Sequence, residues 1–232
     1  MEKIILSPPF SNIYPRLKGT TKITGTYTAE QRRGLWRVLT TLRRTENGWL
    51  NNVGLRNPGI HKAKNKENII SISSLKEGDW NYIIDVLSDF DKIKGIEFNI
   101  SCPNANVSMI NSEILEQANS IFDNVIIKVP HLISEDNLYR ISDLGESIVH
   151  ISNTFKTEQG ALSGKYLICK NLKSIYNLKS KKPQQKIIGG GGIYDLDILK
   201  EYESAGADYF SISTLLINPF KTYKLIKEFY EQ

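Results

Sequence analysis

Cys102 has the sequence surroundings of a thiol that could take part in acid–base chemistry. It follows a stretch, 95–101, in which isoleucine and phenylalanine alternate with polar residues, the period-2 pattern of a strand. Pro103 cannot continue a sheet ladder, so we expect the chain to turn there and to leave the thiol at the carboxyl end of the strand. A thiol can act as a base in a polar, partly closed site. The alternative is a small, buried hydrophobic residue.

Other polar residues lie in or near the ends of the neighbouring strands that the sequence predicts. Amides and lysines within strands are rare in a packed core unless a partner satisfies them. Their number therefore indicates a polar ligand. They are Lys22, Asn51, Asn99, Asn104, Lys128, Asn153, Thr154, the glycines 189–192, Ser213 and Thr214.

Lys128 and the glycine run 189–192 suggest how such a ligand would be held. Lys128, within Ile-Ile-Lys-Val-Pro, could extend to the rim, point inward as a cation beside a developing anion, or form a Schiff base. Lys22 admits the first two readings. The glycines let backbone N–H groups approach an anion at the start of the next helix, or they simply form a tight turn. They do not match the dinucleotide-binding fingerprint.

The elements that must position these residues alternate between strand and helix. This alternation predicts a parallel sheet, and eight strands predict a single α/β domain, a (β/α)8 barrel (TIM barrel) over 1–232, with its active face at the loops that follow the strands. After the second strand, Asn47-Gly48 predicts an inserted β-hairpin with arms 36–42 and 48–53. The expected strands are 3–6, 20–28, 69–73, 95–102, 124–129, 147–151, 186–188 and 209–213, and the main helices are 80–90, 110–122, 134–144, 160–179, 195–204 and 219–230.

The composition favours a single-domain protein that acts on a small molecule. The chain has 232 residues and is 40% hydrophobic, enough for one sizeable core. Its net charge of +5 is mild and dispersed, so nucleic-acid binding is not indicated. Two cysteines and three histidines without ligand spacing predict neither disulfides nor a metal site. The first apolar run is too short for a membrane span or a signal peptide, so we expect a cytoplasmic protein.

Seven motifs, in order along 20–220, together resemble those of the dihydroorotate dehydrogenases. These are FMN-dependent (β/α)8 barrel oxidoreductases of pyrimidine biosynthesis, and several linked motifs are more specific than any one of them. The motifs are Thr20-Thr-Lys, Asn51-Asn-Val-Gly-Leu-Arg-Asn-Pro-Gly, Glu97-Phe-Asn-Ile-Ser-Cys-Pro-Asn, Ile127-Lys-Val-Pro, Ser152-Asn-Thr, Gly160-Ala-Leu-Ser-Gly-Lys and Ile188-Gly-Gly-Gly-Gly-Ile.

The resemblance implies a role for each matching residue. Cys102 would take a proton from C5 of dihydroorotate while the C6 hydride passes to flavin N5, giving orotate. The substrate would contact Lys22, Asn51, Val53, Gly54, Leu55, Asn99, Asn104, Asn153 and Thr154. FMN would contact Lys22, Asn99, Lys128, Gly164, Gly191, Gly192, Ser213 and Thr214. The resemblance also leaves a homodimer open, since the soluble members of the family are often dimers.

The chain departs from the family pattern in three places, one of which is Ser213, where glycine or tyrosine is common, and it leaves other functions open. After Asn104, residues 105–108 run almost directly into the next helix, where the family has a longer loop that closes over the substrate. The first strand ends in Ser7-Pro8-Pro9 where the family has a small Ala-Ser-Gly-like turn. The alternatives are a tRNA-dihydrouridine-synthase-like FMN reductase, a flavin-binding barrel with reduced catalysis and a lysine-dependent aldolase-like barrel.

Overall fold

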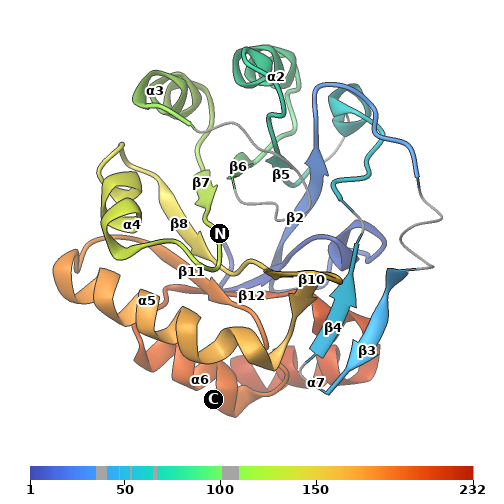
Figure 1. Cartoon of the computed structure of the whole chain (residues 1–232), viewed down its shortest axis with the longest axis vertical. Coiled ribbons are helices and arrows are strands. Elements are labelled where there is room, and N and C mark those ends of the chain that lie inside the picture. The colour runs from blue at the N-terminus through green and yellow to red at the C-terminus, as the bar shows by residue number, and fades with distance from the viewer. Residues whose placement is uncertain (35–40, 47, 53, 65–66, 101–109, 232) are drawn as a thin grey trace.

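A closed barrel of parallel strands forms the centre of the computed structural model (Figure 1), which describes residues 1–34, 41–46, 48–52, 54–64, 67–100 and 110–231. Within these residues the barrel has eight strands in the order β1-β12-β11-β8-β7-β6-β5-β2. The predicted (β/α)8 fold is thereby confirmed. The strands are β1 (Ile4–Leu6), β2 (Thr20–Tyr27), β5 (Ile69–Ile72), β6 (Gly95–Asn99), β7 (Val125–Lys128), β8 (Ile148–Ile151), β11 (Ile187–Gly190) and β12 (Tyr209–Ile212).

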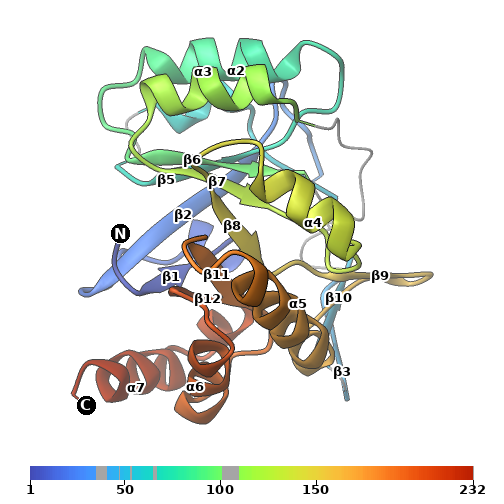
Figure 2. The same cartoon turned by 90° about the vertical axis from the view of Figure 1, so that its left-hand side faces the viewer.

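Helices surround the barrel, as Figures 1 and 2 show from two sides. Four of them begin at residues whose side chains cap them: Asn111, Ser134, Asp195 and Asn218 each accept a hydrogen bond from a backbone N–H of the first turn. The α-helices are α2 (Asp79–Ser88), α3 (Ser112–Ile121), α4 (Glu135–Ser142), α5 (Ile168–Lys181), α6 (Leu196–Ser204) and α7 (Pro219–Tyr230). The 3-10 helices are η1 (Phe10–Asn12), η2 (Ile60–Ala63), η3 (Lys165–Leu167) and η4 (Thr214–Ile217). No helix among the described residues has the length and apolar run needed to cross a bilayer.

The barrel interior changes from apolar to polar along the strands. Its apolar part is a buried cluster of five isoleucines, Ile5, Ile23, Ile69, Ile126 and Ile188. Because side chains two apart on a strand point to the same face, the interior residues one step nearer the carboxyl ends are Ser7, Gly25, Ser71, Lys128 and Gly190. By the same alternation Glu97, His150 and Ser211 also face inward. The carboxyl half of the barrel is therefore built to meet polar groups.

A second, four-stranded antiparallel sheet stands beside the barrel, in the order β3-β4-β10-β9. β3 (Arg43–Thr45) pairs with β4 (Gly48–Asn51), and β10 (Gly160–Ser163) pairs with both β4 and β9 (Phe155–Thr157). The predicted first hairpin arm, 36–42, lies mostly outside the described residues, and the strand that pairs with β4 is Arg43–Thr45. Figure 2 shows β3, β9 and β10 together at one edge of the molecule.

The prediction that a helix opens at Gly160 is wrong. Gly160 to Ser163 form β10, and α5 begins only at Ile168. Gly160 has a φ of 138°, and a Cβ there would lie 2.5 Å from the carbonyl oxygen of Asn51. Gly164 has a φ of 117°. Both glycines are therefore needed for close pairing and for the turn that follows it, and neither starts a helix.

Candidate functional site

Asn99 and Lys128 lie at the carboxyl ends of neighbouring barrel strands. They are register partners, each the last residue of its strand, and are only 7% and 8% exposed. Asn99 Nδ2 donates to Thr26 Oγ1 over 3.1 Å. Asn153, also buried, follows β8, the strand next to β7. Lysine and amide side chains from three adjacent strands therefore gather at one end of the barrel, as predicted.

The glycine run forms a tightly packed turn at the end of β11. A Cβ on Gly191 would lie 2.8 Å from Asn171 Nδ2, and one on Gly192 would lie 2.8 Å from the carbonyl oxygen of Gly164. Both have positive φ, 94° and 80°. The structure thus brings Gly164 and the glycine run together, and only glycine fits there. Such a backbone cradle suits an anionic group.

Two buried side chains fix the carbonyl groups of this turn. Tyr202 Oη donates to the carbonyl oxygens of Gly190 and Gly191, both at 2.8 Å, and Asn171 Nδ2 donates to that of Gly190 at 2.7 Å. Burial is the main reason why the pKa of Tyr202 rises, so its hydroxyl remains a donor at neutral pH. The sequence did not reveal either residue, because each acts from a helix that it shares with ordinary packing residues.

The ends of β1 and β12 meet beside the glycine run. Ser7 Oγ and Ser211 Oγ lie 2.7 Å apart, and Ser213 Oγ donates to the carbonyl oxygen of Pro8 at 2.9 Å. Thr214 starts η4 directly after this contact. Because β12 is the barrel neighbour of β11, with Ser211 in register with Gly190, Ser213 and Thr214 follow a strand that borders the glycine run.

The small sheet brings Asn51 toward the same end of the barrel. Asn51 ends β4, pairs with Ala161 of β10, and its Nδ2 donates to the Ala161 carbonyl oxygen at 3.3 Å. The chain reaches that sheet from the end of β8 through Asn153 and Thr154, where the Thr154 N–H donates to Asn153 Oδ1 at 2.7 Å. After β4, Gly54 and Leu55 both have positive φ, 64° and 54°. Val53, Cys102, Asn104 and the short segment 105–108 lie outside the described residues.

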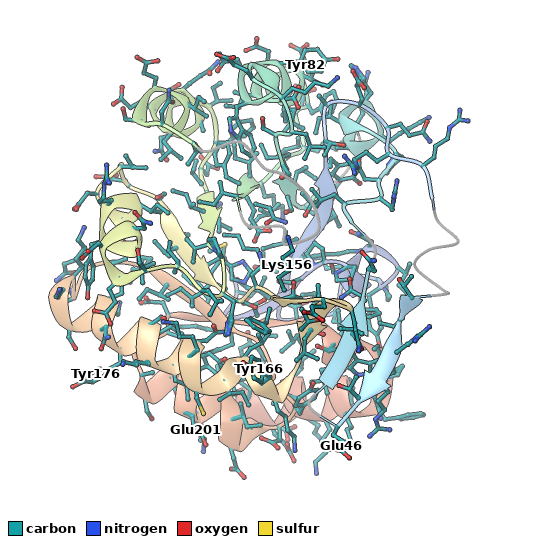
Figure 3. All side chains as sticks on the ribbon, in the orientation of Figure 1. Glu46, Tyr82, Lys156, Tyr166, Tyr176 and Glu201 are labelled. Atoms are coloured by element: carbon teal, nitrogen blue, oxygen red, sulfur yellow. The ribbon has the colours of Figure 1, made fainter. Side chains whose placement is uncertain are left out.

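An aromatic cluster lies next to these residues. Phe155 on β9 packs against Tyr166, which is labelled in Figure 3, with ring centroids 5.1 Å apart, and against His131 at 5.8 Å. His131 Nδ1 and Asn171 Oδ1 lie 3.1 Å apart. Burial lowers the pKa of His131. The cluster therefore links the small sheet to the helix that supports the glycine turn.

Lys22 is not placed with the other candidate residues. It is the third residue of the eight-residue β2 and precedes Ile23 of the apolar layer, so it lies near the amino-terminal end of the barrel. Its Nζ donates to the carbonyl oxygen of Tyr14. It lines a cavity of about 320 Å³ together with Arg16, Lys94 and Asn124, residues that precede barrel strands.

Glu97 and His150 form a buried pair that the sequence analysis did not single out. His150 Nδ1 lies 2.6 Å from Glu97 Oε2, and Ser71 Oγ donates to Glu97 Oε1 at 2.7 Å. Burial would raise the pKa of Glu97, but the charge of Lys128 and the contacts with His150 and Ser71 lower it to about 2. Burial lowers the pKa of His150, against the attraction of Glu97. The signal in the sequence that could have revealed this pair was Glu97, a charged residue at a strand position that faces the barrel interior.

Comparisons with known proteins agree on one family. The family model of dihydroorotate dehydrogenase matches residues 14–232. The catalytic subunit of dihydroorotate dehydrogenase B (NAD(+)) from Thermotoga maritima is 27% identical over 208 residues, which cover 77% of this chain and 75% of that protein. Its counterpart from Oceanobacillus iheyensis is 26% identical over 220 residues, covering 79% and 72%. The crystal structure of DHODH from Eimeria tenella with ferulenol has a TM-score of 0.72 at 15% identity, covering 90% and 73%, a likeness of fold alone.

Proposed function

Because the chain belongs to the dihydroorotate dehydrogenase family, we propose that it is an FMN-dependent oxidoreductase that converts dihydroorotate to orotate. One observation carries the proposal. The glycine cradle formed by Gly164, Gly191 and Gly192 lies at the same end of the barrel as the buried side chains of Asn99 and Lys128. A turn that suits an anion and strand ends that carry polar and cationic side chains lie at one end of the barrel. This combination suits a phosphate-bearing cofactor with an electron-rich ring.

In this proposal, one set of residues at the carboxyl end of the barrel binds the phosphate of FMN and another set contacts its ring. Gly164, Gly191, Gly192, Ser213 and Thr214 hold the phosphate. The positive φ of Gly191 and Gly192 supports this role, because a turn of this kind lets successive backbone N–H groups face an anion. Asn99 and Lys128 contact the ring, and the fixed positive charge of Lys128 favours its negatively charged reduced form. When bound, FMN supplies the hydride acceptor.

The amide side chains orient the substrate. Asn99 and Asn153, with Asn51 and Thr154 from the small sheet and Gly54 and Leu55 after it, offer the donors and acceptors that a planar, amide-rich ring requires. Val53 and Asn104 complete this set in the proposal. Cys102 follows β6 by three positions and removes the C5 proton. Lys22, at the other end of the barrel, is not part of the proposed site.

Anaerobic mixing with dihydroorotate tests the function directly. We expect the purified protein to contain FMN or to bind it on reconstitution. Its flavin absorbance band at about 450 nm should then bleach when dihydroorotate is added without oxygen. A protein that cannot be loaded with FMN would contradict the proposal. Loading without bleaching at millimolar substrate would leave a flavin-binding barrel and reject the dihydroorotate activity.

Substituting Gly192 by alanine tests the phosphate cradle. We expect Gly192→Ala to weaken FMN binding by about tenfold or more, since a Cβ 2.8 Å from the Gly164 carbonyl oxygen must push the turn apart. Gly78→Ala is a matched control: its φ of 83° is close to the 80° of Gly192, yet a Cβ there meets nothing within 4 Å. Titrating FMN into the apoproteins measures both affinities. Equal losses in the two variants would show that backbone strain alone is responsible.

A further inference from the structure

Glu97 and His150 place two titratable groups inside the barrel where packing alone would favour apolar residues. Both side chains are 0% exposed. Each carboxylate oxygen has a hydrogen-bond partner, His150 Nδ1 on Oε2 and Ser71 Oγ on Oε1. A carboxylate that accepts at both oxygens is held as an anion, so Nδ1 of His150 carries the proton that it donates.

The pair lies directly beside the proposed cofactor site, with Glu97 two residues before Asn99 on β6 and His150 level with Lys128. His150 is the register partner of Lys128, and Lys128 is that of Asn99. A second connection runs through hydroxyl groups: Ser71 Oγ and Thr26 Oγ1 lie 3.0 Å apart, and Thr26 Oγ1 accepts from Asn99 Nδ2 at 3.1 Å. The charge state of the pair is therefore coupled to residues that we assign to the cofactor.

The second ring nitrogen of His150 is the unusual feature. Nε2 is buried, and among the described residues no atom forms a hydrogen bond with it. An unsatisfied buried nitrogen is costly, so its retention calls for a reason. With Nδ1 donating to Glu97, Nε2 can accept a proton without breaking any hydrogen bond of the pair.

The charges around His150 balance only while the flavin ring of the cofactor is neutral. The charged groups that act on the imidazole are Lys128 on the neighbouring strand β7 and Glu97 on β6, the strand after it, with opposite signs. With a neutral imidazole their charges sum to zero. A negative charge arriving above Lys128 leaves the buried region with a net charge of −1, and burying a net charge is unfavourable. Protonation of His150 would cancel it.

We propose that His150 is a redox-linked proton site, neutral while FMN is oxidised and protonated at Nε2 when FMN is reduced. The inference rests on the proposed function, because it requires FMN above Lys128. Two electrons and one proton, delivered together as a hydride by a dihydropyrimidine or separately by a reductant and solvent, leave the flavin ring anionic, and one further proton passes from solvent to Nε2. Reoxidation by the electron acceptor returns that proton to solvent. His150 is thus a positioning residue that stabilises the reduced state from beside the cofactor site.

The pH dependence of the FMN midpoint potential measures this proton. In a dithionite titration of the holoenzyme with mediator dyes, each proton bound per two electrons changes the reduction equilibrium tenfold per pH unit, or about 30 mV. We expect about 60 mV per pH unit between pH 6 and 8 for the native protein and about 30 mV for His150→Gln. Glu97→Gln should also fall to about 30 mV, because the anion that stabilises the imidazolium is gone.

An exposed histidine provides the control. His61 contacts only the Tyr82 hydroxyl among the hydrogen bonds found for its side chain, and His61→Gln should keep the slope of the native protein. If neither buried variant folds, ¹⁵N NMR of the native holoenzyme replaces them: the His150 ring should show an imidazolium pattern only after reduction. A native slope of about 30 mV, an unchanged slope in His150→Gln or a neutral ring after reduction overturns the inference alone. A chain that does not bind FMN overturns the proposed function and the inference together.

Discussion

Replacing Cys102 by alanine is expected to slow the reduction of bound FMN by dihydroorotate by about 10²–10⁴-fold, the usual contribution of a positioned acid–base group. The thiol follows β6, and both the last residue of that strand, Asn99, and the next residue, Ile100, are buried at the carboxyl end of the barrel. Without this thiol, the proposed base that accepts the C5 proton is missing. Anaerobic stopped-flow absorbance measures the flavin reduction rate directly, apart from the step that reoxidises FMN.

The second cysteine of the chain gives a matched control for this experiment. Cys169 is exposed near the start of α5, so Cys169→Ala removes a thiol without reaching the site. Its reduction rate should equal that of the native protein. FMN binding should be unchanged in both variants. A Cys102→Ala protein that reduces FMN at the native rate would show that Cys102 is a packing residue and that another group takes the proton.

Replacing Glu97 by alanine is expected to lower the free energy of unfolding by about 3–5 kcal/mol, the usual cost of leaving a buried charge without its partner. The variant removes the acceptor of His150 Nδ1 and Ser71 Oγ and the negative charge that faces Lys128. Urea denaturation of the apoprotein measures the loss. Glu116→Ala, an exposed glutamate on α3, should change stability by no more than about 0.5 kcal/mol. Equal effects in the two variants would refute the structural role of the buried pair.

The same carboxylate should make the native protein sensitive to acid. Lys128, His150 and Ser71 overcome the effect of burial and lower the pKa of Glu97 from 4.5 to about 2. A pKa below its unfolded value gives stability that is present above about pH 4.5 and is lost as the pH falls toward 2. The stability difference between the native protein and Glu97→Gln should therefore shrink over that interval. A difference that stays constant would mean that Glu97 is not ionised in the folded barrel.

The buried charges of Glu97 and Lys128, with His150, also bear on the short segment after Asn104, where the family has a longer loop that closes over the substrate. A lid excludes water and so strengthens electrostatic interactions within a site. Here Lys128 and Asn99 are buried without such a loop, with only 8% and 7% of their surfaces exposed in the described structure. The barrel itself therefore supplies part of the low-dielectric surroundings that this chemistry needs, from below the site.

The sequence by itself determined the barrel, because strand and helix periodicities are local properties. The eight strands of the barrel match the eight predicted ones. Asn99, Lys128 and Asn153 could be located because each lies at or just after the end of a short apolar strand. The glycine run could be identified because only glycine combines positive φ with so little space.

Tertiary structure decided what depends on pairing between distant segments. β10 was mistaken for the start of a helix because its partner β4 lies about 110 residues earlier, as in the contact between Asn51 and Ala161. Lys22 belongs to a motif whose order is right, but β2 has eight residues. Only the position of Ile23 in the apolar layer and the cavity that Lys22 shares with residues before the barrel strands show which end Lys22 occupies. Glu97 and His150 are 53 residues apart in the sequence, and they meet inside the barrel because only β7 separates their strands and the sheet curves around its interior. Closure of a barrel is a long-range property, and the chemistry inside it follows from that closure.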